Sequence, residues 1–138
     1  MEWSRANEVL PTEMRRPERC DVSDLFRGSS SRLHEADLVI TAEGSLDGQT
    51  PFGKVPAEIA RRAKTAGVPV VALAGTIGKG IRLNFDCGID AFASILTLPY
   101  SLEDAISSAP KLLARAAEDA VRMIMIGTTL RIPTGKVG

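Results

Sequence analysis

The strongest constraint on the fold comes from two short apolar runs separated by one helix-length segment. The runs are DLVIT (37–41) and VPVVALA (68–74), and both have the length and β-branched content of buried strands. Between them, residues 55–66 place apolar side chains along one stripe, as in an amphipathic helix. A third strand is predicted over 90–96 and a long helix from Ser101. This alternation indicates an α/β fold, in which a parallel sheet with right-handed βαβ crossovers forms a Rossmann-like three-layer arrangement.

Helix boundaries are also visible in the sequence. Pro56 suits the first turn of the helix over 55–66, and Gly67 suits the left-handed residue that follows that helix. Ser101 and Asp104 have the spacing of a capping box, so the last helix is predicted to begin there. Pro110 is expected to kink or split this helix, because proline has no N–H to donate and its ring crowds the preceding turn.

Three regions of the chain differ in character. Residues 1–32 are rich in Arg, Glu and Ser without a sustained period, which indicates an irregular amino-terminal arm. Residues 33–126 form the predicted α/β domain, and residues 127–138 are expected to be a frayed tail. Three strands are fewer than α/β domains usually carry and would leave open sheet edges. The domain is therefore expected to be part of a larger fold, or to have an edge covered by a separate partner chain.

Charge and composition exclude several classes of partner. Seventeen basic residues balance 17 acidic ones, so no net field favours nucleic acid or an anionic membrane. The most apolar segments are too short to cross a bilayer, and no run at the amino end could serve as a signal peptide. The two cysteines have no CxxC spacing, and Cys87 is expected to be a small buried residue. A cytoplasmic protein that binds neither nucleic acid nor membrane is expected.

Chemistry is expected in the segment that follows the first strand, EGSLDGQTPFGK (43–54). In open parallel sheets ligands bind beyond the carboxyl ends of the strands, and a second loop, GTIGKG (75–80), leaves its strand at the same end. Glu43 and Asp47 bring two carboxylates that are suited to orienting a hydroxyl or holding Mg²⁺. Lys54 falls at the start of a helix, where its charge opposes the helix dipole unless an anion binds there.

Plainer interpretations of both loops are kept beside the functional ones. GQTPFGK (48–54) fits the first seven positions of a Walker A motif, but Val55 stands where a Mg²⁺-binding Ser or Thr is required, so a true P-loop is not expected. Asp47 and Gly48 are a common turn pair, which leaves a purely turn-forming role open. The glycines of 75–80 lack the dinucleotide-binding spacing, and both a flexible turn and an anion cradle stay open for that loop.

Several spaced motifs resemble one family. Residues 36–75, ADLVITAEGSLDGQTPFGKVPAEIARRAKTAGVPVVALAG, resemble the carboxyl-terminal part of bacterial-type glycerate kinases, whose pattern is close to DLVITGEGxxDxQTxxGKxPxxVAxxA followed by a VPVIALAG-like strand. GIDAFASI (88–95) and SLEDAI (101–106) resemble later segments of that family, so the resemblance covers about residues 33–126. Ala42 departs from the usual Gly, and the family's PDSFKGSLSA-like segment and its intervening domain are not found. The positions that match the first motif are Glu43, Gly44, Asp47, Gln49, Thr50, Gly53, Lys54 and Pro56.

The resemblance implies a kinase that uses ATP and Mg²⁺ to phosphorylate glycerate, usually to 2-phosphoglycerate, in a cleft between two α/β domains. It implies catalytic roles for Asp47, Lys54 and Glu43, with Glu43 and Asp47 as Mg²⁺ ligands or as groups that orient the glycerate hydroxyl. The residues expected to bind substrate or phosphate are Gly44, Ser45, Gln49, Thr50, Gly53, Gly75 and Thr76.

Two other functions are weighed against a kinase. A truncated, non-catalytic remnant or a split subunit would keep the fold and bind an anion or a partner chain. An unrelated nucleotide-binding module is disfavoured, because the resemblance extends well beyond one loop.

Overall fold

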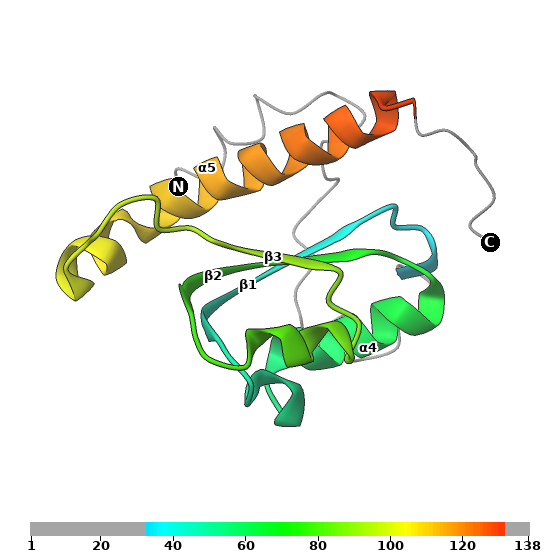
Figure 1. Ribbon diagram of the computed structural model, residues 1–138, viewed down its shortest axis with the longest axis horizontal. Coiled ribbons are helices and arrows are strands. Elements are labelled where there is room, and N and C mark those ends of the chain that lie inside the picture. Colours follow the sequence, from blue (N-terminus) through cyan, green and yellow to red (C-terminus); the bar gives the residue numbers. More distant parts are fainter. Residues whose placement is uncertain (1–32, 132–138) are drawn as a thin grey trace.

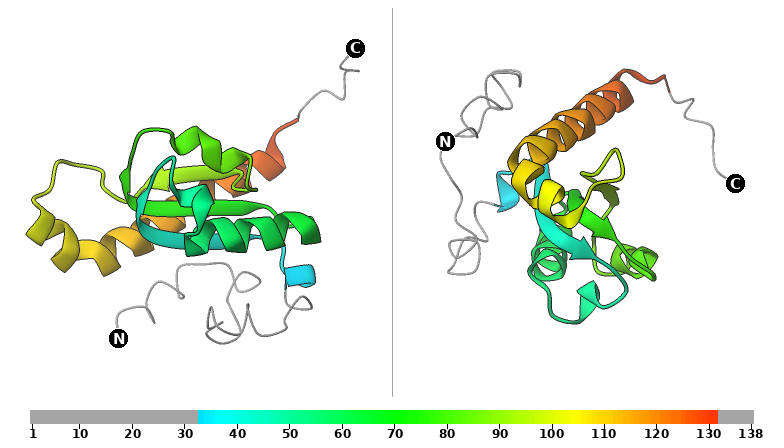
Figure 2. Two further views of the ribbon diagram at one scale, coloured as in Figure 1. Left: turned by 90° about the horizontal axis from the view of Figure 1, so that it is seen from below. Right: turned by 90° about the vertical axis from the view of Figure 1, so that its left-hand side faces the viewer.

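The computed structural model of the chain describes residues 33–131 (Figure 1). The predicted amino-terminal arm and residues 132–138 of the predicted tail lie outside this range. A sheet forms the middle layer, with one long helix on each face; Figure 2 shows the same layers from two further directions. The elements in chain order are β1 (Val39–Leu46), the 3₁₀ helix η2 (Thr50–Phe52), α4 (Val55–Ala66), β2 (Val70–Ile77), the 3₁₀ helix η3 (Ile81–Phe85), β3 (Ala91–Ser94) and α5 (Leu102–Thr129).

The sheet is parallel, and its order in the described part of the chain is β1-β2-β3. α4 lies in the connection from β1 to β2, and η3 lies in the connection from β2 to β3. The register pairs Val39 with Val70 and Val71 with Ala91. The predicted three-layer α/β fold with a parallel sheet is therefore confirmed.

Strands β1 and β2 extend farther toward their carboxyl ends than the sequence predicts. Glu43–Leu46 belong to β1 and Gly75–Ile77 belong to β2, so the prediction that loops begin at Glu43 and Gly75 is wrong. Glycine and serine disfavour strands by propensity, but the ladder continues to the pair Leu46 and Ile77. Leu46 is fully buried, and enclosing this side chain accounts for the extra length of β1.

Helix α4 begins and ends where the sequence predicts. Pro56 lies in its first turn, where a missing N–H costs nothing. Gly67 follows the last residue with φ +74°, and its N–H bonds the carbonyls of Ala63 and Lys64. This left-handed cap reverses the chain toward β2 without a Cβ penalty.

The main core lies between α4 and the sheet. Small side chains meet there, which lets the helix lie close to the strands at the packing density of a protein interior. Close packing fixes the position of α4, and with it the position of Lys54 at its amino end. The residues of this layer that are at most 1% exposed include Ala57, Ala60 and Ala63 on α4 and Val70, Ala72 and Ala74 on β2.

Helix α5 covers the opposite face of the sheet and packs against β2, where Leu73 is fully buried. Ser101 caps it as predicted, because its Oγ accepts a hydrogen bond from the N–H of Asp104 at 3.1 Å. Pro110 lies inside α5 and does not split it, although the first turns (yellow) run at an angle to the remainder (orange) in Figure 1. The helix continues to Thr129, beyond the residue at which fraying was expected, because Gly127 is tolerated in a helix at a modest cost. No helix in the described range is long and apolar enough to span a membrane.

Candidate functional site

The two predicted loops meet at the carboxyl edge of the sheet. The N–H of Gly48 bonds the carbonyl of Lys79 at 2.9 Å, and the N–H of Gly78 bonds the carbonyl of Leu46 at 2.8 Å. These bonds join the segment after β1 to the segment after β2, backbone to backbone. The expectation that both segments line one rim is therefore confirmed, and we call residues 47–54 the strand-end loop.

Glycine is required where the two segments cross. A Cβ on Gly80 would lie 3.0 Å from the Cα of Gly48, and one on Gly48 would lie 3.2 Å from the Cα of Gly80. Gly80 also has φ +73°, a conformation that other residues rarely adopt. Close backbone packing thus explains why glycines occur at these positions. The sequence analysis considered only a flexible turn or an anion cradle for the second loop.

The strand-end loop is held by a local turn around Asp47. Its Oδ1 accepts hydrogen bonds from the N–H of Gln49 at 2.9 Å and from the hydroxyl of Thr50 at 3.4 Å, while its own N–H donates to that hydroxyl oxygen at 3.0 Å. The bond from Gln49, together with the neighbouring Lys54 ammonium, holds the pKa of the Asp47 carboxyl below its ordinary value of 3.8, although desolvation opposes the shift. The carboxylate is therefore ionised at neutral pH.

Thr50 and Gln49, both expected to bind substrate, are placed differently. Thr50 is fully buried and its hydroxyl is used by Asp47, so it shapes the loop from inside. Gln49 is exposed, and its side chain can reach a ligand outside the loop. Gly53 ends η2 with φ +128° and a bond from its N–H to the carbonyl of Thr50, in an open environment.

Lys54 is the rim cation that lies beside Asp47. Its Nζ lies 3.6 Å from Oδ1 of Asp47 and 3.4 Å from the carbonyl oxygen of Ser45. The carboxylate of Asp47 offsets the unfavourable position of a cation at the amino end of α4. The sequence analysis had expected a bound anion to fill this role. Both contacts are long for an ammonium group, and the pair is about one-third exposed, so the attraction is weak and the ammonium remains accessible to an anion.

Glu43 is not brought to this pair. It lies inside β1, four residues before Asp47, which corresponds to roughly 13 Å along an extended strand. Its carboxylate accepts a hydrogen bond from the N–H of Gly44 at 3.1 Å and is otherwise exposed. In the described range no three His, Cys, Asp or Glu side chains gather as a metal site. Glu43 therefore stands apart from the Asp47–Lys54 pair along β1.

Gly75 and Thr76 occupy the end of β2 rather than a loop. A Cβ on Gly75 would lie 2.8 Å from the carbonyl oxygen of Gly44 on β1, so this position has no room for a side chain. Thr76 pairs with Ser45 across the two strands and is exposed at the rim. In the part of the chain that the structure describes, no hydrogen bond or ion pair joins Gly75 or Thr76 to the Asp47–Lys54 pair.

Asn84 is a site residue that the sequence analysis missed. It is fully buried in η3, and its Nδ2 donates to the carbonyl of Asp47 at 2.9 Å and to that of Ile81 at 2.8 Å. The only signal in the sequence is a polar residue within IRLNF, which does not reveal a partner 37 positions away.

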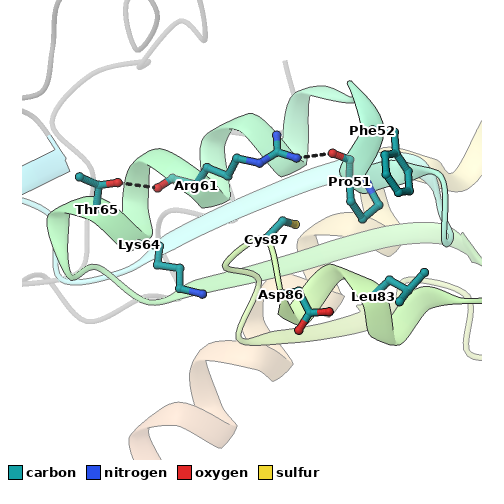
Figure 3. A pocket seen from close by; sticks show the side chains of 8 residues that line it. All are labelled: Pro51, Phe52, Arg61, Lys64, Thr65, Leu83, Asp86 and Cys87. Carbon is teal, nitrogen blue, oxygen red and sulfur yellow. Dashed lines mark hydrogen bonds between the residues drawn. The ribbon is translucent and has the colours of Figure 1, made fainter.

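An open depression of about 540 Å³ lies beside the strand-end loop, between α4 and η3 (Figure 3). Phe52 and Leu83 form an apolar end, Thr65 and Lys64 lie at the other end, and Asp86 lies between the two ends. Neither Asp47 nor Lys54 lines it. The depression therefore adjoins the carboxylate–lysine pair without containing it.

Fold and site together define an α/β protein of the kind that handles a ligand at the carboxyl edge of a parallel sheet. The comparison with known proteins then gives the family. The sequence model of the glycerate kinase family matches residues 20–125, and the chain belongs to that family. The match begins ahead of residue 33, where the resemblance was located, and so includes part of the predicted irregular amino-terminal arm.

Individual relatives agree with this assignment. The glycerate kinase of Halalkalibacterium halodurans is 45% identical over 87 residues, which are 63% of this chain and 23% of that protein. The glycerate 2-kinase of Escherichia coli K12 is 36% identical over 95 residues, which are 69% of this chain and 25% of that protein. A crystal structure of a glycerate kinase 2 from Salmonella typhimurium LT2 matches with a TM-score of 0.53 and 35% identity, over 73% of this chain and 25% of that one. The chain thus spans about a quarter of the length of the relatives that it matches.

Proposed function

We propose that this chain supplies one wall of a glycerate kinase site, in which ATP phosphorylates glycerate to a phosphoglycerate, with 2-phosphoglycerate as the expected product. The observation that carries the proposal is the Asp47–Lys54 pair, which lies at the carboxyl edge of the sheet within the segment that resembles the family's first motif. Phosphoryl transfer depends mostly on positioning and on stabilising charge, and a carboxylate beside an ammonium can contribute to both.

Lys54 is proposed to bind anionic oxygens of glycerate or of the transferred phosphoryl group. Its ammonium has three donors, and the two described contacts are long, so an anion can bind without displacing a strong partner. The exposed amide of Gln49 is proposed to position substrate. Thr50 acts indirectly, by fixing the turn that orients Asp47.

Asp47 is proposed to orient the glycerate hydroxyl or to hold Mg²⁺. Its Oδ1 is engaged by the turn, which leaves the second carboxylate oxygen for a cation, and Mg²⁺ commonly takes one or two protein carboxylates together with substrate phosphates. Bound Mg²⁺ would neutralise charge that develops on the phosphate oxygens. Glu43 is proposed only as a separate group on β1, since the strand keeps it away from Asp47.

The decisive assay measures phosphoglycerate formation by the purified chain with ATP, Mg²⁺ and glycerate, first alone and then mixed with a relative from which the matching quarter has been deleted. Turnover only after mixing would support a split enzyme. A folded chain that gives no turnover under either condition would refute the catalytic role. The position of the phosphate on the product, read by NMR, tests the expected 2-phosphoglycerate.

A non-catalytic role is the second candidate, and its supporting observation is the coverage of about a quarter of each relative. Under that role the chain keeps the fold and binds an anion or a partner chain. Co-purification with the deleted relative, without turnover, would favour it. In either role we place the protein in the cytoplasm, where the free thiol of Cys87 would stay reduced.

A further inference from the structure

We infer that Asn84 is a positioning residue for the strand-end loop: its side-chain amide fixes the carbonyl of Asp47 and so sets where the Asp47 carboxylate stands relative to Lys54. This inference rests on the proposed function, because it concerns the same pair of side chains. Asn84 itself is enclosed and does not reach a ligand at the rim, so it acts through Asp47.

The orientation of the Asn84 amide is fixed by its neighbours. Nδ2 lies 2.9 Å from the carbonyl oxygen of Asp47 and 2.8 Å from that of Ile81. Both neighbours are acceptors only, so a flipped amide would set oxygen against oxygen. One N–H of the amide therefore bonds within η3, to Ile81, and the other bridges η3 to the strand-end loop at Asp47.

Stability alone does not account for this amide. Its Oδ1 is buried and has no hydrogen-bond partner among the described residues. A buried polar side chain that is only half satisfied is a poor way to fill a core, because its unpaired atom has lost its bonds to water. What the amide provides is a link between segments 37 positions apart in the chain.

The link acts at the residue that carries the chemistry. The carbonyl of Asp47 also accepts from the N–H of Thr50 at 3.2 Å, the first bond of the turn that presents the carboxylate. The carbonyl of Asp47 thus accepts from the Asn84 amide and from the turn at the same time. Without the amide, the strand-end loop keeps its bonds to the segment after β2 but loses the hydrogen bond that joins Asp47 to η3.

Native-state hydrogen exchange followed by NMR tests the inference without any substrate. In Asn84→Ala, the amide protons of Gly48 and Thr50 should exchange about tenfold or more faster, the effect of one buried hydrogen bond, beyond any change at core amides of β2. Cys87→Ala is the matched control, because it removes a buried side chain whose Sγ donates to the backbone carbonyl of Asn84 and leaves the amide bridge in place. Equal loosening of the loop and the core in Asn84→Ala, or equal loosening of the loop in Cys87→Ala, would overturn the inference.

A measurement on the unaltered chain covers the case in which Asn84→Ala does not fold. The two side-chain amide protons of Asn84 should exchange slowly, since both are bonded to backbone carbonyls and the side chain is fully buried. Rapid exchange of these protons in the folded chain would contradict the bridge. A glycerate-binding measurement separates the proposed function from the role of Asn84. Failure of the unaltered chain to bind glycerate counts against the proposed function alone. The exchange results bear on Asn84 alone.

Discussion

The contact between Gly75 and Gly44 gives a prediction whose size follows from the structure. These glycines lie on neighbouring strands, but a Cβ on Gly75 would be 2.8 Å from the carbonyl oxygen of Gly44, whereas a Cβ on Gly44 would meet nothing within 4 Å. Replacing glycine by alanine stabilises by about 0.4–1 kcal/mol where the backbone permits it, chiefly by restricting the unfolded chain. That gain is common to both substitutions and cancels when they are compared.

The difference between Gly75→Ala and Gly44→Ala therefore isolates the steric cost. Forcing a methyl group into a filled site costs about 1–3 kcal/mol, so Gly75→Ala should be less stable than Gly44→Ala by that amount. With an m-value of roughly 1–3 kcal/mol/M in urea, a difference of about 2 kcal/mol separates the midpoints by roughly 0.7–2 M. Urea unfolding followed by circular dichroism measures both variants under the same conditions. Coincident midpoints would refute the claim that close strand packing, rather than phosphate binding, requires glycine at position 75.

Three further predictions concern the site and the core. Because the pKa of Asp47 in the folded chain lies below its unfolded value, the ionised carboxylate stabilises the fold fully above about pH 4, and this stabilisation is lost as the pH falls through the folded pKa. In the acid range the urea midpoint of Asp47→Asn should therefore depend less on pH than that of the unaltered chain. Parallel plots of midpoint against pH for the two proteins would contradict this. Lys54→Ala should weaken glycerate binding by about ten- to hundredfold in calorimetric titrations, the effect of one charge-assisted bond, while Lys64→Ala, which lines the neighbouring depression near the other end of α4, should bind as before. Leu73→Ala should lower the free energy of unfolding by about 2–5 kcal/mol in urea, because it empties a fully buried site beneath α5; a change below about 1 kcal/mol would show that α5 is not packed there.

Much of the fold could be predicted because its signals are local. The apolar stripe of residues 55–66, Pro56 and Gly67 define α4 from its own sequence, and the capping box defines the start of α5. The ends of β1 and β2 could not be predicted in this way. Strand pairing that is fixed by the burial of Leu46 overrides the loop preference of the glycines and serine nearby.

In the candidate site, too, features with a local sequence signal could be predicted and features that depend on long-range contacts could not. Asp47 and Lys54 were found because a motif and its position at a strand end point to them, and the structure brings them within 3.6 Å. Glu43 was grouped with them because it is only four residues from Asp47 in the sequence. The spacing does not show that the intervening residues are extended strand, which separates the two carboxylates. Asn84 was missed because a hydrogen bond over 37 positions leaves no local pattern.

The backbone bonds between the strand-end loop and the segment after β2 also determine how this edge of the molecule can move. Gly48 and Gly78 each donate to the other segment, and Gly80 leaves no gap beside Gly48. Opening one segment away from the other would break these bonds together, which makes independent fluctuation of either segment costly on the timescale of lid motions. We therefore expect the two segments to move together, so that a ligand at this edge would meet a rim that keeps its shape.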